Sequence, residues 1–146
     1  MKTFNFFSED TPFVLKKKRL CKEWLDRAAK EEKVTVSAIN YIFCSDEYLL
    51  QINRQYLNHD YLTDVITFPY SEKPAALESD IFISVDRCRE NAKTYDVRAE
   101  EEIHRVMIHG FLHLCGYDDK TPEEKKLMSQ KEDYYLSLRP AKLKEV

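Results

Sequence analysis

Two histidines four residues apart, His109 and His113, are the side chains of this sequence best suited to chemistry. On an α-helix such residues lie on one face, one turn apart, so the two imidazoles can bind the same metal ion. The two glycines of the chain, Gly110 and Gly116, both fall in the stretch 109–119. Because a glycine inside a helix costs about 1 kcal/mol relative to alanine, Gly110 indicates a close approach by another backbone or by a metal-bound group.

Two carboxylates follow the histidines. Gly116 stands where a helix ends with a residue of positive φ, which turns the chain back, so we expect Asp118 and Asp119 to lie near the imidazoles. A tetrahedral site of two histidines, one carboxylate and an open position for water is a known catalytic zinc arrangement, in which the metal lowers the pKa of the water to about 7. The pattern His-x3-His-x5-Asp therefore predicts a site that produces hydroxide at neutral pH. The same ligand set also describes non-haem iron oxygenases, which remain an alternative.

A helix must hold the two histidines in place. Apolar residues recur at helical spacing between about residues 99 and 115 and predict a mostly buried helix: Ile103, Val106, Met107, Ile108, Phe111, Leu112 and Leu114. On such a helix His104 is rotated by about 140° from the ligand face, so we expect it at the surface or in edge packing. Cys115 points about 200° away from His113, so we expect it to pack in the core.

The remaining patterns predict strands and helices in a mixed order. Strands are expected at 3–7, 34–44, 64–68 and 80–84, with a long loop at 70–79. Helices are expected through Leu20–Ala28, after Ser45 as N-cap, at about 86–95, and at about 122–138 after a capping box of Thr121 and Glu124. This order favours an α+β domain, in which a small mixed sheet of about four strands is packed by helices and the metal site lies on a central helix.

Length and composition predict one compact domain. With 146 residues, of which 43% are hydrophobic, the chain can bury a core, and we expect a single domain spanning 1–146. There is no apolar run of about 18 residues and no signal-peptide pattern, so we expect a cytoplasmic protein without membrane contact. The four cysteines form no Cys-x-x-Cys pair, which argues against a zinc ribbon or a thioredoxin-like motif, and we expect reduced thiols.

The charge of the chain limits how it could bind nucleic acid. A formal net charge of −3 argues against broad, sequence-independent binding, which needs a clearly basic face. Two local basic groups, Lys16–Arg19 and the pair Arg87 and Arg89, could still contact phosphates. A solvated helix face beside compensating acids is the plainer interpretation of each group. The charge therefore does not exclude RNA.

The stretch His-Gly-Phe-Leu-His-Leu-Cys-Gly-Tyr-Asp, residues 109–118, resembles the signature of the YbeY family of metal-dependent endoribonucleases. Residues 53–56 together with 63–69 resemble the second signature of that family, and residues 80–84 resemble the third, in the usual order. The resemblance implies a zincin-like α+β fold and metal-dependent cleavage of single-stranded RNA in ribosomal RNA maturation. It also implies single-stranded RNA and the ribosome or ribosomal proteins as partners.

The resemblance carries over two metal ligands, His109 and His113, for one ion that we expect to be zinc. Family members usually have a third histidine at position 119, so Asp119 is expected as a substituted third ligand. The other departures are Leu57 in place of arginine, Leu62 in place of proline and Ser79 in place of glycine.

Leu57 is the departure that matters most for chemistry. An arginine there would be a candidate for clamping a phosphate, so its absence puts strong nuclease activity in question. A non-catalytic ribosome assembly factor with a structural metal is the corresponding alternative. His59 is a candidate phosphate contact, acid or metal neighbour, and a solvated loop histidine is the plainer interpretation. Asp64 either orders its loop by capping or hydrogen-bonds a ligand histidine.

The position after the first histidine bears on the reaction class. Zinc proteases of the His-Glu-x-x-His type carry their general base there, where this chain has Gly110, so a peptidase mechanism of that kind lacks its base. For an RNA phosphodiester a metal ion can instead polarise a phosphoryl oxygen while water or a ribose 2′-hydroxyl attacks, and both nucleophiles remain open. Asp118 is the nearest candidate for a general base.

Overall fold

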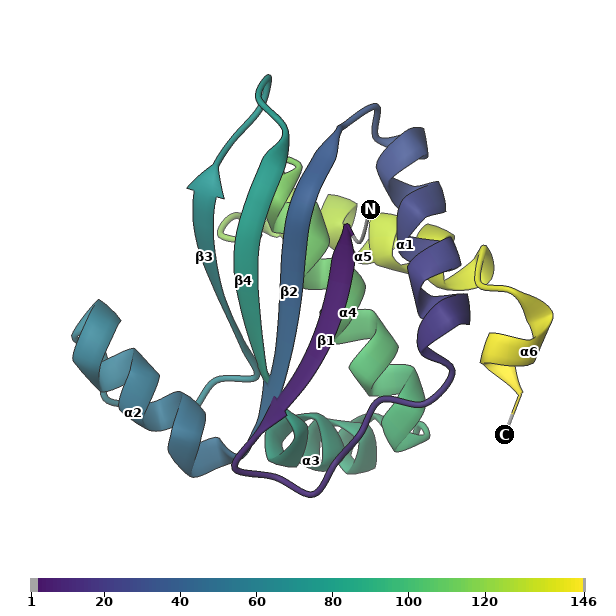
Figure 1. Cartoon of the computed structure of the whole chain (residues 1–146). Helices are drawn as coiled ribbons and strands as arrows, with labels where there is room; N and C mark the ends of the chain where they lie inside the picture. Colours follow the sequence, from purple (N-terminus) through teal and green to yellow (C-terminus); the bar gives the residue numbers. More distant parts are fainter. Residues whose placement is uncertain (1–2, 146) are drawn as a thin grey trace.

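This computed structural model describes residues 3–145 and contains a four-stranded mixed sheet with helices packed mainly on one face (Figure 1). The strands are β1 (Phe4–Glu9), β2 (Val36–Cys44), β3 (Val65–Ser71) and β4 (Leu77–Ser84). The helices are α1 (Lys18–Glu31), α2 (Asp46–Leu57), α3 (Val85–Tyr95), α4 (Ala99–Leu114), α5 (Pro122–Ser137) and the short, unpredicted α6 (Ala141–Lys144). The predicted α+β class is confirmed, while residues 1, 2 and 146 of the predicted domain lie outside the described part of the chain.

The sheet has the order β1-β2-β4-β3, in which β1, β2 and β4 are parallel and β3 is antiparallel to β4. Successive residues of a strand point to opposite faces. Ile81 and Ile83 of β4 are buried in the main core with α1 and α4, and Phe82 packs on the other face in a smaller cluster with Leu49 of α2. The largest buried side chains are Trp24, Tyr41, Tyr135, Phe4, Phe43 and Phe111. In Figure 1 α4 and α5 lie behind the sheet, and its front face is largely open.

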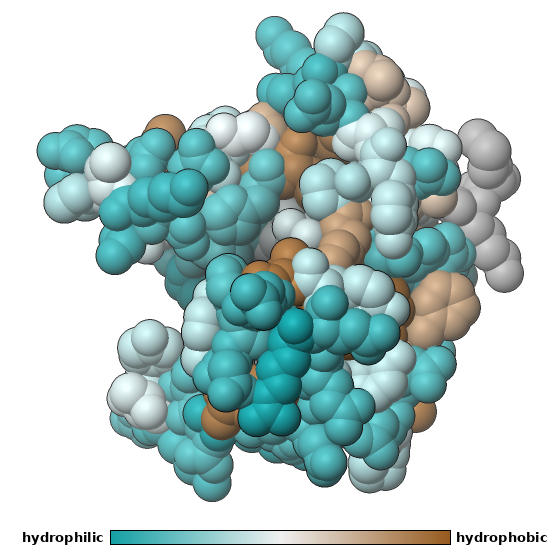
Figure 2. Space-filling model, turned by 90° about the vertical axis from the view of Figure 1, so that its left-hand side faces the viewer, coloured by the Kyte–Doolittle hydropathy of each residue, from teal (hydrophilic) through white to brown (hydrophobic). Residues whose placement is uncertain are grey.

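The open face carries a ladder of polar side chains across all four strands. Asn5 of β1 donates to Asn40 of β2 at 3.0 Å, and Asn40 donates to Asp80 of β4 at 3.0 Å. Tyr70 of β3 donates to the other oxygen of Asp80 at 2.8 Å. Figure 2, which views the molecule from the side of α2 and β3, shows a mostly hydrophilic surface with hydrophobic residues gathered in a hollow near its centre.

The β3–β4 hairpin differs from the prediction. A strand closed by Pro69 and a long loop at 70–79 were expected, but β3 runs through Pro69 to Ser71 and β4 already begins at Leu77. Because β3 is an edge strand, the missing N–H of a proline need not cost a ladder hydrogen bond. The pairing register shifts between Pro69 and Ser71. The long loop was therefore wrong, and residues 72–76 form the connection.

Gly110 lets α4 lie close to the sheet. A methyl group at this position would lie 3.1 Å from Cγ2 of Ile81 and 3.6 Å from Cγ2 of Val65. The close neighbours are therefore side chains of β4 and β3, whereas the sequence indicated a backbone or a metal-bound group. This contact brings the part of α4 that carries both histidines onto the sheet.

Gly116 ends α4 as predicted, with a φ of +107°. Its N–H donates to the carbonyl of His113 at 3.0 Å, and the N–H of Tyr117 donates to the carbonyl of Leu112 at 3.1 Å. These are the paired hydrogen bonds of a Schellman motif, which satisfy carbonyl groups that the helix end leaves without partners. The backbone after His113 is thereby fixed in direction.

The start of α5 holds the other end of the same loop. The predicted capping box is present, since Thr121 accepts from the N–H of Glu124 and Glu124 accepts from the N–H of Thr121. Only residues 115–121 lie between the two helices, so the segment that carries Asp118 and Asp119 is short and fixed at both ends. None of the helices within residues 3–145 is long and apolar enough to cross a bilayer.

Candidate metal centre

Three side chains of the motif meet at one point. Nε2 of His113 lies 3.0 Å from Nε2 of His109. Oδ2 of Asp119 lies 3.3 Å from Nε2 of His109 and 3.4 Å from Nε2 of His113. Within the described residues this is the one group of three or more histidine, cysteine or acidic side chains whose ligand atoms all lie within 4.8 Å of one another. The structure thus brings all three predicted ligands together.

The spacing of these atoms suits a metal ion. A tetrahedral ion with ligand bonds of about 2.0–2.1 Å holds neighbouring ligand atoms about 3.3–3.4 Å apart. The three distances in the cluster, 3.0, 3.3 and 3.4 Å, are close to that value. Two imidazole nitrogens and one carboxylate oxygen suit zinc and several other transition ions, so the donor set fits the predicted class of ion.

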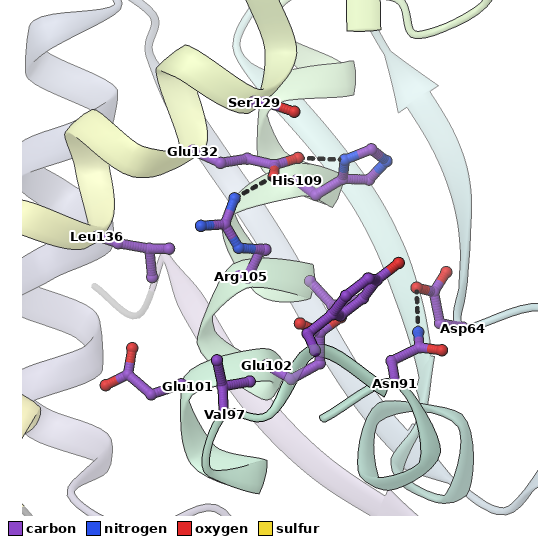
Figure 3. Close-up of a pocket in the computed structure, with 12 residues that line it drawn as sticks. Asp64, Asn91, Val97, Glu101, Glu102, Arg105, His109, Ser129, Glu132 and Leu136 are labelled. Carbon is purple, nitrogen blue, oxygen red and sulfur yellow. Dashed lines mark hydrogen bonds and ion pairs between the residues drawn. The ribbon is translucent and has the colours of Figure 1, made fainter. Parts of the chain in front are cut away.

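Glu132 of α5 orients the imidazole of His109. Its Oε2 lies 2.6 Å from Nδ1 of His109, and its Oε1 accepts from Nη1 of Arg105 at 2.7 Å (Figure 3). Because a carboxylate oxygen accepts hydrogen bonds, Nδ1 of His109 donates a hydrogen bond to Glu132, and the lone pair of Nε2 is left free for a metal ion. Burial opposes the charged form of His109, but the hydrogen bond and the charge of Glu132 outweigh it and raise the pKa of His109.

The interpretation of the sequence missed Glu132, which lies 23 positions after its histidine. A signal was available, because its neighbours at helical spacing on α5 are apolar or aromatic and buried: Met128, Tyr135 and Leu136. A charged residue inside such a stripe needs a partner. Arg105, one turn before His109 on α4, is the matching cation and was missed with it.

A second buried carboxylate, Glu32, holds the loop that carries Asp119. It stands at the end of α1 and accepts a hydrogen bond from the hydroxyl of Tyr117 at 2.8 Å. It also accepts from Lys131 at 3.3 Å and from the hydroxyl of Tyr135. Burial disfavours the charged form of Glu32, but these hydrogen bonds outweigh it and lower its pKa. The loop between α4 and α5 is thereby tied to the end of α1.

The other two carboxylates considered from the sequence lie outside the cluster. Asp118 is exposed, and its role as general base stays a prediction. Asp64 accepts a hydrogen bond from Asn91 at 3.3 Å and so ties the start of β3 to α3. The carboxylate bonded to Nδ1 of His109 is Glu132, and not Asp64 as one alternative expected.

The expected position of His104 was wrong. It was expected at the surface or in edge packing, but it is 4% exposed. Its Nδ1 lies 2.9 Å from Nη1 of Arg139, and its ring centroid lies 5.7 Å from that of Trp24. Burial, followed by the charge of Arg139, lowers the pKa of His104 to about 4. The prediction failed because α4 is covered by α1 and by the chain after α5 as well as by the sheet.

The remaining residues singled out from the sequence lie in or near α2. Leu57 is the last residue of that helix and is partly exposed. His59 is exposed, its Nδ1 lies 2.9 Å from the hydroxyl of Tyr61, and the two rings are stacked. These contacts lie within its own loop, and its functional alternatives stay untested.

The four cysteines are buried and free, as expected from the sequence. Cys115 is the one within the motif, and burial raises the pKa of its thiol to about 12. A protonated thiol is a poor metal ligand, so core packing is the role that its surroundings support.

Known proteins resemble this chain over nearly its whole length. The family model described as Endoribonuclease YbeY matches residues 5–138. A protein named endoribonuclease YbeY from Cytophaga hutchinsonii is 53% identical over 137 residues, which cover 94% of this chain and 96% of the relative. One of the same name from Flavobacterium psychrophilum is 48% identical over 132 residues, which cover 90% and 94% of the two chains.

A solved structure matches as well. The solution structure of TM1509 from Thermotoga maritima aligns with a TM-score of 0.65 and 30% identity, and covers 92% of this chain and 87% of that one. Sequence signatures, ligand geometry and fold therefore agree over the same residues. The chain belongs to the endoribonuclease YbeY family.

Proposed function

We propose that the protein is a metal-dependent endoribonuclease that cleaves single-stranded RNA, with one zinc ion held by His109, His113 and Asp119. The observation that carries this proposal is the triangle of ligand atoms with sides of 3.0, 3.3 and 3.4 Å. Membership of the endoribonuclease YbeY family supports RNA as the substrate class. A bound ion would supply a Lewis acid that polarises a phosphoryl oxygen and lowers the pKa of a water molecule.

The protein itself prepares the ligand atoms. Glu132 holds a proton on Nδ1 of His109, so the lone pair of Nε2 is available without a change of tautomer. The hydrogen bond from Arg105 keeps that carboxylate in place. Asp119 adds a negative charge from a loop that is fixed by helix ends on both sides, so little ordering is needed when an ion binds.

Asp118 is our proposed general base, because its exposed carboxylate directly precedes Asp119 on the same short loop. We expect Asp118→Asn to lower the cleavage rate by about 100-fold, since general base catalysis contributes about 10²–10⁴-fold. The metal content of this variant should equal that of the wild type. Unchanged cleavage would remove Asp118 from the mechanism and leave the metal site standing.

The cellular role that we propose is ribosomal RNA maturation in the cytoplasm, with the ribosome or ribosomal proteins as partners. Its support is the ordered resemblance of three signatures to the family. A single domain spanning 1–146 is part of the same proposal. It is supported by one core cluster that includes residues from Phe4 to Leu143.

Metal content and RNA cleavage, measured on the same samples, test the proposal. Elemental mass spectrometry of protein purified under reducing conditions should find about one equivalent of zinc, as a single tetrahedral site requires. The zinc should be lost in His113→Ala and reduced in Asp119→Ala, and cleavage of a single-stranded RNA should fall in parallel. Asp26→Ala, on the exposed side of α1, is the matched control and should change neither quantity.

Three other outcomes would favour different conclusions. Wild-type protein that binds no metal under these conditions would overturn the site. Bound metal without RNA cleavage would favour a non-catalytic ribosome assembly factor, the alternative suggested by Leu57 in place of the family's arginine. Oxygen-dependent turnover with iron would favour an oxygenase.

A further inference from the structure

A cavity of about 500 Å³ adjoins the metal centre, between α3, α4, α5 and the start of β3 (Figure 3). His109 and Glu132 line one part of it, and Asp64 and Asn91 line another. His109 is therefore shared by the cavity and the metal cluster. The volume falls in the range of about 300–1,000 Å³ that is usual for small-molecule sites. A group bound in the cavity would lie beside a phosphate held at the metal.

The cation in the wall of this cavity is already engaged. Arg105 bonds Glu132 at 2.7 Å and Asp133 at 2.5 Å. Glu101, another residue of the wall, bonds Arg139 at 2.9 Å. Because its arginine is neutralised by two carboxylates, the cavity does not attract a phosphate. What remains for a ligand is mainly carboxyl acceptors, beside the amide of Asn91 and the hydroxyl of Ser129.

Glu102 is a buried carboxyl of the cavity that forms no salt bridge with a residue of the described part of the chain. It lines the cavity although it is only 5% exposed. Burial, reinforced by the charge of Asp64, raises the pKa of Glu102 to about 7. The amide of Asn91, which donates to Asp64 at 3.3 Å, is the polar group beside the two carboxyls. A carboxyl in this position gains from a ligand that donates hydrogen bonds.

Apart from Ser129, the rest of the wall is apolar or aromatic. Val97, Val106 and Leu136 line the cavity, and Tyr95 adds a ring that is 65% exposed. A hydrated cation would gain nothing from such walls. A nucleobase has flat faces that stack on an aromatic ring and hydrogen-bond donors along its edge, so it matches both kinds of surface.

We propose that this cavity binds one base of the RNA substrate and that it prefers guanine. The proposal rests on the RNA cleavage proposed above. Guanine presents its N1–H and its 2-amino group side by side, so one carboxylate can accept both. Adenine and cytosine present an amino group beside an acceptor nitrogen, and uracil presents one N–H between two carbonyls. Glu102 is then a specificity-determining residue, assisted by Asp64, and Tyr95 stacks on the base.

Changing one base of the substrate tests this without changing the protein. Zinc-loaded wild-type protein would be given single-stranded RNAs of uniform uridine that carry one guanosine, adenosine, cytidine or inosine. We expect cleavage beside guanosine to be faster than beside the others by roughly five- to 100-fold, the range of a good bidentate base contact. Inosine lacks the 2-amino group and should lose most of the advantage. Equal rates for all four RNAs would overturn the base subsite and leave the nuclease intact.

Substitutions assign the preference to the cavity. Glu102→Gln replaces one acceptor oxygen by a donor amide, so it should abolish the advantage of guanosine over inosine while the protein keeps its zinc. Glu100→Gln, on the same helix but outside the cavity, is the matched control and should retain the advantage. Tyr95→Leu, at an exposed position that tolerates change, should weaken the advantage several-fold. An advantage that survives in both cavity variants would overturn the assignment.

Binding measured without cleavage separates this proposal from the proposed function. We expect guanosine monophosphate to bind the zinc-loaded protein about tenfold more tightly than inosine monophosphate in calorimetric titrations, and Glu102→Gln to remove the difference. That result would support the subsite even if no RNA were cleaved and the proposed function failed. Equal affinity for the two nucleotides would overturn the base subsite. So would a cavity that binds neither nucleotide but binds Mg²⁺ through Glu102.

Discussion

His104 and His109 lie on the same helix, five residues apart, and have opposite surroundings. Nδ1 of His104 is paired with the guanidinium of Arg139, and burial with that positive charge lowers its pKa to about 4. Nδ1 of His109 is paired with Glu132, whose hydrogen bond and charge overcome burial and raise its pKa. His104 therefore stays neutral in the core, whereas the carboxylate of Glu132 stabilises a positive charge on the ring of His109.

The partner of the Nδ1 atom decides which histidine can bind a metal. Arg139 donates, so Nδ1 of His104 accepts and its other nitrogen carries the proton, which leaves no lone pair for a ligand. Glu132 accepts, so His109 keeps its proton on Nδ1 and presents the lone pair of Nε2. From the sequence alone, the two residues differ only in the face of the helix on which they lie. In the structure, the opposite charges of their partners give them different chemistry.

The largest contrast should come from replacing each histidine by alanine. We expect His109→Ala to lose the metal and to lower RNA cleavage by more than about 100-fold, because even residues behind a ligand are worth about 10–100-fold. His104→Ala should keep its metal but lower the free energy of unfolding by about 2–4 kcal/mol, since it opens a cavity and leaves Arg139 without its acceptor. Elemental analysis and urea unfolding measure the two effects. Loss of metal from both variants would break the comparison.

The pH dependence of stability should identify His104. Its pKa is lowered to about 4 in the folded protein, so between pH 6.5 and 4 the unfolded chain binds the additional proton and stability falls with falling pH. Over this range the loss should be roughly 3 kcal/mol. The raised pKa of Glu102, about 7, acts in the opposite direction, with stability falling as pH rises from 4.5 to 7.

The measurement is therefore the difference between wild type and His104→Gln, which can still accept from Arg139 but does not titrate. Urea unfolding of both proteins at pH 7 and at pH 4.5, with the same metal loading, cancels the contributions of Glu102 and of metal release. The stability of the wild type should fall further than that of the variant. Equal losses would mean that His104 titrates normally in the folded protein.

A smaller effect is expected when the partner of His109 is changed. Glu132→Gln keeps the size of the side chain but removes its charge, so we expect metal affinity to fall by about 10–100-fold, as is typical of residues that orient a ligand. Competition with a coloured chelator measures the affinity. Asp133→Asn is the matched control, because Asp133 also bonds Arg105 but is largely exposed and does not contact the histidine. If both variants bind metal like the wild type, the charge of Glu132 has no effect on the ligand.

Signals carried by neighbouring residues predicted the local structure well. The period of α4, the glycine that ends it and the capping box of α5 all depend on residues within a few positions of one another. The same local signals place His109, His113 and Asp119 on a helix and the loop after it, and the structure brings them together. The β3–β4 hairpin was misread because Pro69 ends a central strand but not an edge strand.

Contacts between distant segments could not be predicted in this way. Glu132 and Arg139 reach α4 from α5 and from the chain after it, so neither shares a sequence pattern with the histidine that it contacts. The apolar stripe around Glu132 predicts that its carboxylate needs a partner but not which one. His104 was misplaced for the same reason, since only the packing of α1 against α4 shows that its face of the helix is covered.

The hydrogen bonds that Glu32 accepts constrain the order in which the parts of the chain fold. Its partners Tyr117, Lys131 and Tyr135 lie 85, 99 and 103 residues further along the chain. Contacts across such long loops form late compared with helices and turns. During synthesis the loop that carries Asp119 can therefore take its final form only after α5 has emerged and met the end of α1. Metal uptake by a growing chain would thus indicate that α5 has packed against the end of α1.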